Sequence, residues 1–214
     1  MEGLLRLYQQ PYDPEYPVVC FDERPCFLIG DTRLEIPMKT GKVAKQHYGY
    51  SKHGSCCILG AIEPKTGFRL AHIRERRTKK EFALFMDQLA GYFPKAKQIR
   101  LVMDNLNTHH AGAFYEFFKA DHAGYLAELF QFQFTPKNAS WLNMMEIEYS
   151  ALSRLCLNRR IPSMKQIEEQ TVLFFNERMR NKIQIKWQFD VDNARKKLNR
   201  HYLKVNPINK FQLT

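Results

Sequence analysis

The order of apolar segments limits the fold of this sequence more than any other feature does. Residues 18–29, 48–62 and 68–73 are rich in β-branched and aromatic side chains and predict strands, with a turn at residues 64–67. Helix-like and strand-like segments alternate only after residue 78. Because consecutive strands tend to pair as antiparallel neighbours, this order predicts an α/β fold with a mixed sheet flanked by helices.

Local signals place the later elements. Thr78 followed by Glu81, and Ser163 followed by Gln166, have the spacing of capping boxes and predict that helices begin there. Apolar periodicity predicts two further helices, at residues 109–118 and 140–157, and two further strands, at residues 99–103 and 129–134. We interpret the proline-containing residues 1–16 as an extended linker, residues 17–162 as the main domain, and residues 163–214 as a helical extension packed on it.

Length and composition exclude several classes of protein. A chain of 214 residues suits one domain with a sizeable core. No apolar run approaches the ~20 residues that cross a bilayer, and no export signal is visible, so we expect no membrane partner and a cytoplasmic location. The five cysteines lack C-x-x-C spacing, and we expect reduced thiols rather than a zinc site.

The net charge favours a polyanionic partner. Lys and Arg exceed Asp and Glu by 33 − 22 = 11, which suits nucleic acid through counterion release. The basic residues form three clusters: Arg74, Arg76, Arg77, Lys79 and Lys80; Arg159 and Arg160; and Arg195, Lys196, Lys197 and Arg200. A solvated basic face is the alternative for each cluster, and we favour it for the last.

Two aspartates lie where a buried strand meets polar residues. Asp22 interrupts the apolar run VVCFDERPCFLI, and a buried carboxylate needs a cation, a metal or donors beside it. A strand-end aspartate before a turn explains Asp22 equally well. Asp104 follows IRLVM at the strand end where ligands bind in open α/β sheets, and Asn107 and His109 add donors suited to phosphate. A solvated turn at Asp104 and Asn105 is the alternative.

A third acid lies on the helix predicted at residues 140–157. Glu146 and Glu148 each point about 80° from the centre of the apolar stripe, on opposite sides, so helical geometry does not choose between them. One of these acids could converge with Asp22 and Asp104 on one sheet edge. Oxygen-only ligands suit Mg²⁺ or Mn²⁺, and two such ions ~4 Å apart serve phosphodiester chemistry.

Three segments carry a family resemblance: PYDPEYPVVCFDERP, RLVMDNLNTHH and FTPKNASWLNMMEIEYSALSRLCLNRRIP. They resemble the DDE transposases of bacterial insertion sequences of the IS six-thirty type, in the mariner superfamily, from about Tyr12 to Tyr202. The resemblance implies a ribonuclease H-like fold with a mixed five-stranded sheet at residues 17–162. It also implies catalytic, metal-binding acids at Asp22, Asp104 and Glu146, which selects Glu146 over Glu148. The interval of 146 − 104 = 42 residues is longer than usual in the superfamily, and we interpret residues 120–128 as an inserted loop.

The expected activity is metal-dependent cleavage of DNA at transposon ends and strand transfer into target DNA, with two Mg²⁺ or Mn²⁺ ions. The resemblance implies a homodimer on DNA in a bacterial cytoplasm, associated with the nucleoid, and a separate N-terminal helix-turn-helix partner encoded upstream. The rival hypotheses are a catalytically silent relic or a regulator that binds DNA or transposase, and a ribonuclease H, which the TPKxxSWLN segment does not suit. The residues expected to contact DNA or phosphate are Asn105, Asn107, His109, Lys137, Trp141, Asn143, Arg159, Arg160, Arg76, Arg77, Lys79 and Lys80. For Trp141 we favour a core anchor over base stacking.

Overall fold

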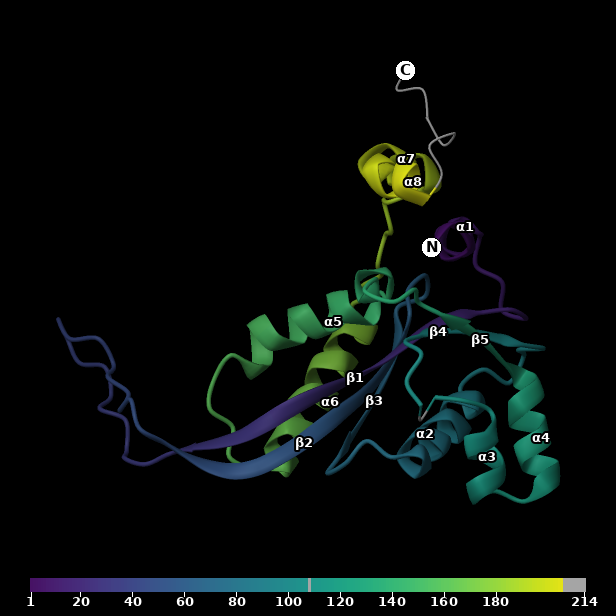
Figure 1. Ribbon diagram of the computed structural model, residues 1–214. Helices are drawn as coiled ribbons and strands as arrows, with labels where there is room; N and C mark the ends of the chain where they lie inside the picture. Colours follow the sequence, from purple (N-terminus) through teal and green to yellow (C-terminus); the bar gives the residue numbers. More distant parts are fainter. Residues whose placement is uncertain (108, 206–214) are drawn as a thin grey trace.

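A mixed five-stranded sheet organises the protein, whose computed structural model describes residues 1–107 and 109–205 (Figure 1). The strand order is β3-β2-β1-β4-β5. The first three strands pair antiparallel, β4 pairs parallel with β1, and β5 pairs parallel with β4, which confirms the predicted mixed sheet. The strands are β1 (Val18–Asp31), β2 (Tyr50–Glu63), β3 (Phe68–Arg74), β4 (Ile99–Met103) and β5 (Phe130–Phe134).

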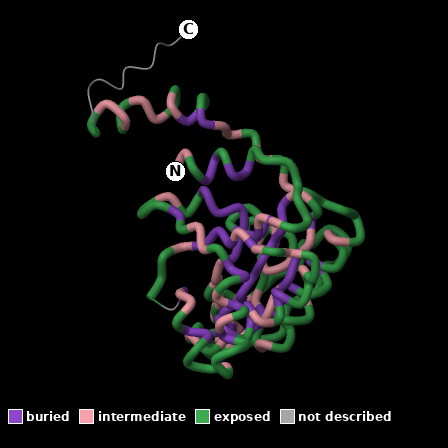
Figure 2. The backbone as a smooth tube through the Cα atoms, turned by 90° about the vertical axis from the view of Figure 1, so that its right-hand side faces the viewer, coloured by how far each residue is buried: buried purple, intermediate pink, exposed green. Residues whose placement is uncertain are grey.

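Helices cover both faces of the sheet, and each face has its own apolar core. Phe21 packs with Phe82 and Phe114 on one face, whereas Cys20 and Met145 belong to the core of the other, as the alternation of side chains along a strand requires. Figure 2 shows that the buried backbone concentrates in this central region. The first face carries α2 (Lys79–Gly91), α3 (Gly112–Phe117) and α4 (Ala120–Leu129); the second carries α5 (Met145–Leu152) and α6 (Met164–Arg180).

The predicted helix starts are confirmed where a side chain caps the backbone. Thr78 accepts a hydrogen bond from the Glu81 amide, and Ser163 accepts one from the Gln166 amide, both at 3.3 Å. The helix predicted at residues 140–157 is instead divided into a 3₁₀ turn (Ser140–Leu142), α5, and a π-helical turn (Ser153–Leu157). Its apolar stripe still faces the core at Leu142, Met145, Tyr149 and Leu152, whereas no residue of the π-helical turn is buried.

Two predicted irregular segments are helical. Residues 1–16 do not form an extended linker throughout, because α1 (Glu2–Gln9) buries Leu4, Leu5, Leu7 and Tyr8. The prolines that suggested a linker all follow this helix. Residues 120–128 belong to α4 rather than to a loop, since Ala123, Leu126 and Leu129 form a buried stripe at helical spacing.

The C-terminal part of the described chain is helical. The long helix α6 packs on β3, as expected for an extension on the same domain. It is followed by α7 (Val191–Lys197) and α8 (Asn199–Val205), and Arg195 of α7 forms an ion pair with Glu2 of α1 at 2.9 Å. Residues 206–214 of the predicted extension lie outside the described residues. No helix in the described ranges has the length and apolar character needed to cross a membrane.

The strands predicted at residues 18–29 and 48–62 form one long hairpin, β1 and β2. Residues 32–49, here called the arm, project away from the body beyond the ends of β1 and β2 (Figure 1). Pro25 is accommodated because β4 pairs only with Val18–Cys20, so that one side of β1 has no strand partner at Pro25 among the described residues.

Candidate active site

The register of β1 and β4 brings the first two predicted acids together. Cys20 pairs with Val102 in parallel, so continuing the register by two residues sets Asp22 opposite Asp104. Neighbouring strands lie ~4.8 Å apart, and residues two apart share a face of the sheet. Asp22 and Asp104 therefore leave neighbouring strands at the same end of the sheet, with the Asp104 carboxylate turned toward the His109 ring beside Phe21 and Phe82.

Glu146 approaches the same place from the first turn of α5, where its side chain is exposed. Burial raises the pKa of Asp22 to about 7, against a hydrogen bond from the Glu23 amide, and the charges of Glu146 and Asp104 raise it further. Three acids from distant parts of the sequence thus act on one another electrostatically. A cluster of this kind favours a bound cation, which would relieve the repulsion.

Glu148, the alternative to Glu146, has a different role. Its carboxylate is fully buried and accepts hydrogen bonds from Arg69 at 2.8 and 3.0 Å, and it also pairs with Arg178 at 2.6 Å. Arg69 lies on β3 and Arg178 on α6, so this ion pair joins α5 to both elements. Because both oxygens of Glu148 are held by guanidinium groups, the geometry favours Glu146 as the acid available to a ligand.

His109 was expected to orient phosphate, and its ring is buried between two carboxylates. The side chain is 1% exposed, with Nδ1 2.8 Å from a carboxylate oxygen of Asp104 and Nε2 3.2 Å from one of Glu23. Burial opposes the charged ring, but the hydrogen bonds to the two carboxylates outweigh it and raise the pKa of His109 to about 9. His109 therefore positions Asp104, with both ring nitrogens already in use.

Asn143 also supports an acid instead of facing DNA. Its side chain is buried, and its amide donates to the Phe21 carbonyl at 2.7 Å and more weakly to Asp22 at 3.4 Å. Its carbonyl oxygen accepts from the Met145 amide at 3.1 Å. The amide of Asn143, expected to contact phosphate, thus joins the start of α5 to β1 beside Asp22.

Sequence reasoning missed two residues that seat α5 on the sheet. The Tyr149 hydroxyl lies 2.8 Å from the carbonyl oxygens of both Asp22 and Ile58. Gly60 pairs with Asp22 across the strands, and a Cβ there would lie 2.6 Å from Met145 and 2.7 Å from Tyr149. The only sequence signal was a glycine inside an apolar strand, which indicates a close approach.

Basic and polar side chains lie beside the acids. Arg77 lines a shallow pocket with Asn105, Leu106 and Asn107, on the loop that follows Asp104. Arg76 and Lys80 are also exposed, whereas Lys79 is paired with Glu116 at 2.6 Å. This part of the predicted DNA surface is therefore open to a phosphate backbone.

Arg160 is tied to the base of the arm rather than open to DNA. Its guanidinium binds Asp31 at 2.6 Å and donates to the carbonyls of His47, Tyr48 and Gly49. These protein acceptors therefore compete with DNA for the donors of Arg160, which was expected to contact DNA. Arg159 donates to Gln170 at 2.7 Å and is otherwise on the surface.

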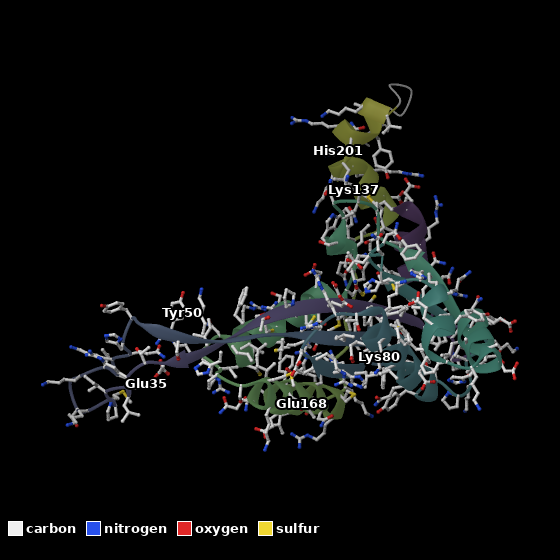
Figure 3. All side chains as sticks on the ribbon, turned by 60° about the horizontal axis from the view of Figure 1, so that its bottom comes forward. Glu35, Tyr50, Lys80, Lys137, Glu168 and His201 are labelled. Atoms are coloured by element: carbon white, nitrogen blue, oxygen red, sulfur yellow. The ribbon has the colours of Figure 1, made fainter. Side chains whose placement is uncertain are left out.

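Trp141, for which the sequence favoured a core anchor over base stacking, is exposed and packs against other aromatic rings. Its ring stacks on Trp187 with centroids 6.5 Å apart and meets Phe189 edge-on at 5.5 Å. It shares an apolar pocket with Lys137, away from the acids. Figure 3 shows Lys137 and Lys80 on separate parts of the surface.

Carboxylate oxygens suit a hard metal ion, but the side chains of the acids do not converge on one metal position. Among the residues described, no three His, Cys, Asp or Glu side chains converge closely enough to hold a metal. The donors are carboxylate oxygens, which Mg²⁺ and Mn²⁺ prefer. An oxygen of buried Glu23 lacks a partner, and Asp22 carries a raised pKa, so the site has acidic groups that a cation would satisfy.

Comparisons with known proteins identify the family of this chain. Residues 17–168 match the sequence model of the family described as "DDE superfamily endonuclease". No curated protein matches the sequence.

Solved structures of Mos1 transposase share the fold. A paired-end complex with the left transposon end has a TM-score of 0.56 at 14% identity, over 85% of this chain and 55% of that one. A paired-end complex with Mn has a TM-score of 0.54 at 14% identity, over 99% of this chain and 61% of that one. The strand transfer complex has a TM-score of 0.53 at 13% identity, over 99% of this chain and 60% of that one. The chain thus spans about three fifths of the proteins it resembles, and the likeness confirms the α/β, ribonuclease H-like sheet. Since the family match covers well over half of its length, this chain belongs to the DDE superfamily endonucleases.

Proposed function

We propose that this chain is the catalytic domain of a DDE transposase, which cleaves DNA at transposon ends and transfers the freed strands into target DNA. The observation that carries the proposal is that the register of β1 and β4 brings Asp22 close to Asp104, while Glu146 of α5 lies near enough to raise the pKa of Asp22. The Mos1 complexes with a transposon end and with transferred strands support it, because they share the fold.

Asp22, Asp104 and Glu146 would hold two Mg²⁺ or Mn²⁺ ions. Such ions activate an attacking oxygen and stabilise the leaving oxygen of a phosphodiester. The protein's own contribution is to hold the acids in place: Asn143 and Tyr149 fix β1 at Asp22, and His109 fixes Asp104. The Mos1 structure with Mn supports the choice of a divalent ion.

Arg76, Arg77 and Lys80 would contact the DNA backbone beside the acids, with Asn105 and Asn107 donating to the same phosphates. We further propose a homodimer that holds two transposon ends, which the paired-end complexes of Mos1 support. Recognition of the end sequence would come from a helix-turn-helix partner, and the protein would act at the nucleoid of a bacterial cytoplasm.

Nicking of supercoiled plasmid tests the catalytic proposal without requiring recognition of a transposon end. The wild-type chain should nick DNA in Mg²⁺ or Mn²⁺ and not in EDTA, whereas Asp22→Asn, Asp104→Asn and Glu146→Gln should fall to background. Glu169→Gln, which changes an exposed acid on α6, is the matched control and should nick normally. Retained metal-dependent nicking by Asp22→Asn would refute the assignment. DNA binding without nicking by the wild type would favour the silent regulatory or relic protein.

A further inference from the structure

Two cysteines face each other across the first hairpin. Cys26 of β1 and Cys56 of β2 are directly paired in the antiparallel register, and the two thiols influence each other's pKa. Both belong to the apolar core under α5 and α6, with Cys56 buried and Cys26 partly exposed. Cys57 belongs to the core of the opposite face and does not share this contact.

The backbone geometry suits a covalent bond between the two sulfurs. Directly opposed residues of an antiparallel pair have Cα atoms ~4.5 to 5.5 Å apart, and disulfides span ~4.4 to 6.8 Å. The Cα separation expected of a directly opposed pair therefore lies within the range that a disulfide spans. The pair lies four residues along β1 from Asp22, between that acid and the arm.

We propose that Cys26 and Cys56 are a peroxide-oxidised thiol pair that closes reversibly into a disulfide at the root of the arm. The proposal is independent of the transposase activity, since it rests only on the pairing of the two strands. Cytosolic disulfides are rare and are usually transient or redox-sensing, which suits a reversible bond.

Cys26 is the sulfur that reacts first, because it is the more exposed of the two. The hydrogen bond from Cys56, opposed by burial and aided by the charge of Arg24, lowers the pKa of the Cys26 thiol below its ordinary value. Its thiolate attacks one oxygen of hydrogen peroxide, and the O–O bond breaks to give a sulfenic acid and hydroxide. The Cys56 sulfur then attacks the Cys26 sulfur and displaces the oxygen as water.

The balance is two thiols and one peroxide giving one disulfide and two waters. The sulfurs lose two electrons, which the peroxide accepts, and a thiol reductant reverses the change by exchange. The new bond fixes the register of β1 and β2 next to the irregularity between Phe27 and Ile29. The arm would then be held at its root by a covalent bond.

The exposed arm itself provides a sharp test. Trypsin cleaves after Lys39, Lys42 or Lys45, which are all exposed, and so separates Cys26 from Cys56. After treatment with stoichiometric peroxide, the two fragments of the full chain should run as one band on a non-reducing gel and as two after dithiothreitol. Titration should show that two of the five thiols are lost, and mass spectrometry should find the Cys26–Cys56 peptide.

Cys26→Ser and Cys56→Ser should both separate into fragments after peroxide and trypsin, with or without reductant. Cys156→Ser, which removes a partly exposed thiol of the same core, should stay linked like the wild type. The proposal would be overturned if the wild-type fragments separate without reductant, if Cys26 is converted to a sulfinic acid with Cys56 unmodified, or if another pair of cysteines carries the link.

Discussion

His109 Nδ1 lies 2.8 Å from a carboxylate oxygen of Asp104, while its Nε2 reaches Glu23 at 3.2 Å. The ring is buried and packs against Phe21 and Phe82. A histidine five residues beyond Asp104 thereby ties the loop after β4 to the strand that carries Asp22. Asp104 is therefore held in place by a buried side chain as well as by its own loop.

Replacing His109 should therefore impair catalysis by releasing Asp104. Removal of a residue that orients a metal ligand costs about 10 to 100-fold in metal affinity or activity, so His109→Ala should lose that much nicking rate. His109→Gln keeps a donor and should recover part of it. The stabilisation of the protein by Mn²⁺, measured as a rise in Tm, should weaken in parallel. His122→Ala, a surface histidine paired with Asp87, is the control. Wild-type metal affinity in His109→Ala would contradict the positioning role.

The stability of the metal-free protein should fall as pH rises. The folded-state pKa of His109, about 9, exceeds its ordinary value of 6.5. Its contribution to the free energy of unfolding is therefore complete below pH 6.5 and is lost as pH rises through 9. Asp22 has a folded-state pKa of about 7, above its ordinary 3.8, so folding prefers its protonated form and loses stability between these values. Urea unfolding from pH 4 to 10 should show both falls. Asp22→Asn should remove the loss of stability at the lower pH range, and His109→Gln should remove the loss at the higher range. Unchanged slopes of unfolding free energy against pH would contradict the assignment of these losses to Asp22 and His109.

Replacing Glu146 should affect activity, whereas replacing Glu148 should affect the stability of the protein. Glu146→Gln changes an exposed side chain and should abolish nicking with little change in Tm. Glu148→Gln leaves Arg69 without its buried carboxylate partner, and breaking a buried pair costs about 3 to 5 kcal/mol of unfolding free energy. Urea denaturation of the two variants measures the difference. Comparable losses of stability in both would show that the two acids are not distinguished in this way.

Gly60 should tolerate no side chain. A Cβ at Gly60 would collide with Met145 and Tyr149, and overpacking of this kind costs about 1 to 3 kcal/mol. Gly91→Ala is the matched control, because a Cβ there meets no heavy atom within 4 Å in the described residues and should be neutral or stabilising by up to about 1 kcal/mol. Chemical denaturation compares them. Because α5 would move away from Asp22, Gly60→Ala should also lose nicking activity.

Arg77 and Arg160 should differ in their effect on DNA binding. Each phosphate contact that is removed lowers the slope of log K against log salt by about 0.9, so Arg77→Ala should reduce that slope by about this amount. Arg160→Ala should leave the slope unchanged, since its guanidinium binds Asp31 and arm carbonyls. It should instead hasten tryptic cleavage of the arm. A reduced slope in Arg160→Ala would place DNA at that residue.

The local elements were readable from the sequence because their causes are local. The strand at residues 99–103 and the helix starts after Thr78 and Ser163 were predicted correctly, since strand composition and N-caps depend on residues close in the chain. The helix at α1 was missed because prolines beyond it suggested a linker, and the arm because its exposed residues carry no periodic pattern.

The arrangement of the site was decided by tertiary structure. The sequence by itself determined which acids were candidates, but Asp22 and Asp104 become neighbours only through the register of two parallel strands 82 residues apart, which pairing across the sheet fixes. Likewise, the carboxylate of Glu148 is occupied by ion pairs with Arg69 and Arg178. The ring nitrogens of His109 are occupied by Asp104 and Glu23. Side chains such as Arg160 and Asn143 look free in a sequence, yet burial and the acceptors nearby determine whether their donors remain available.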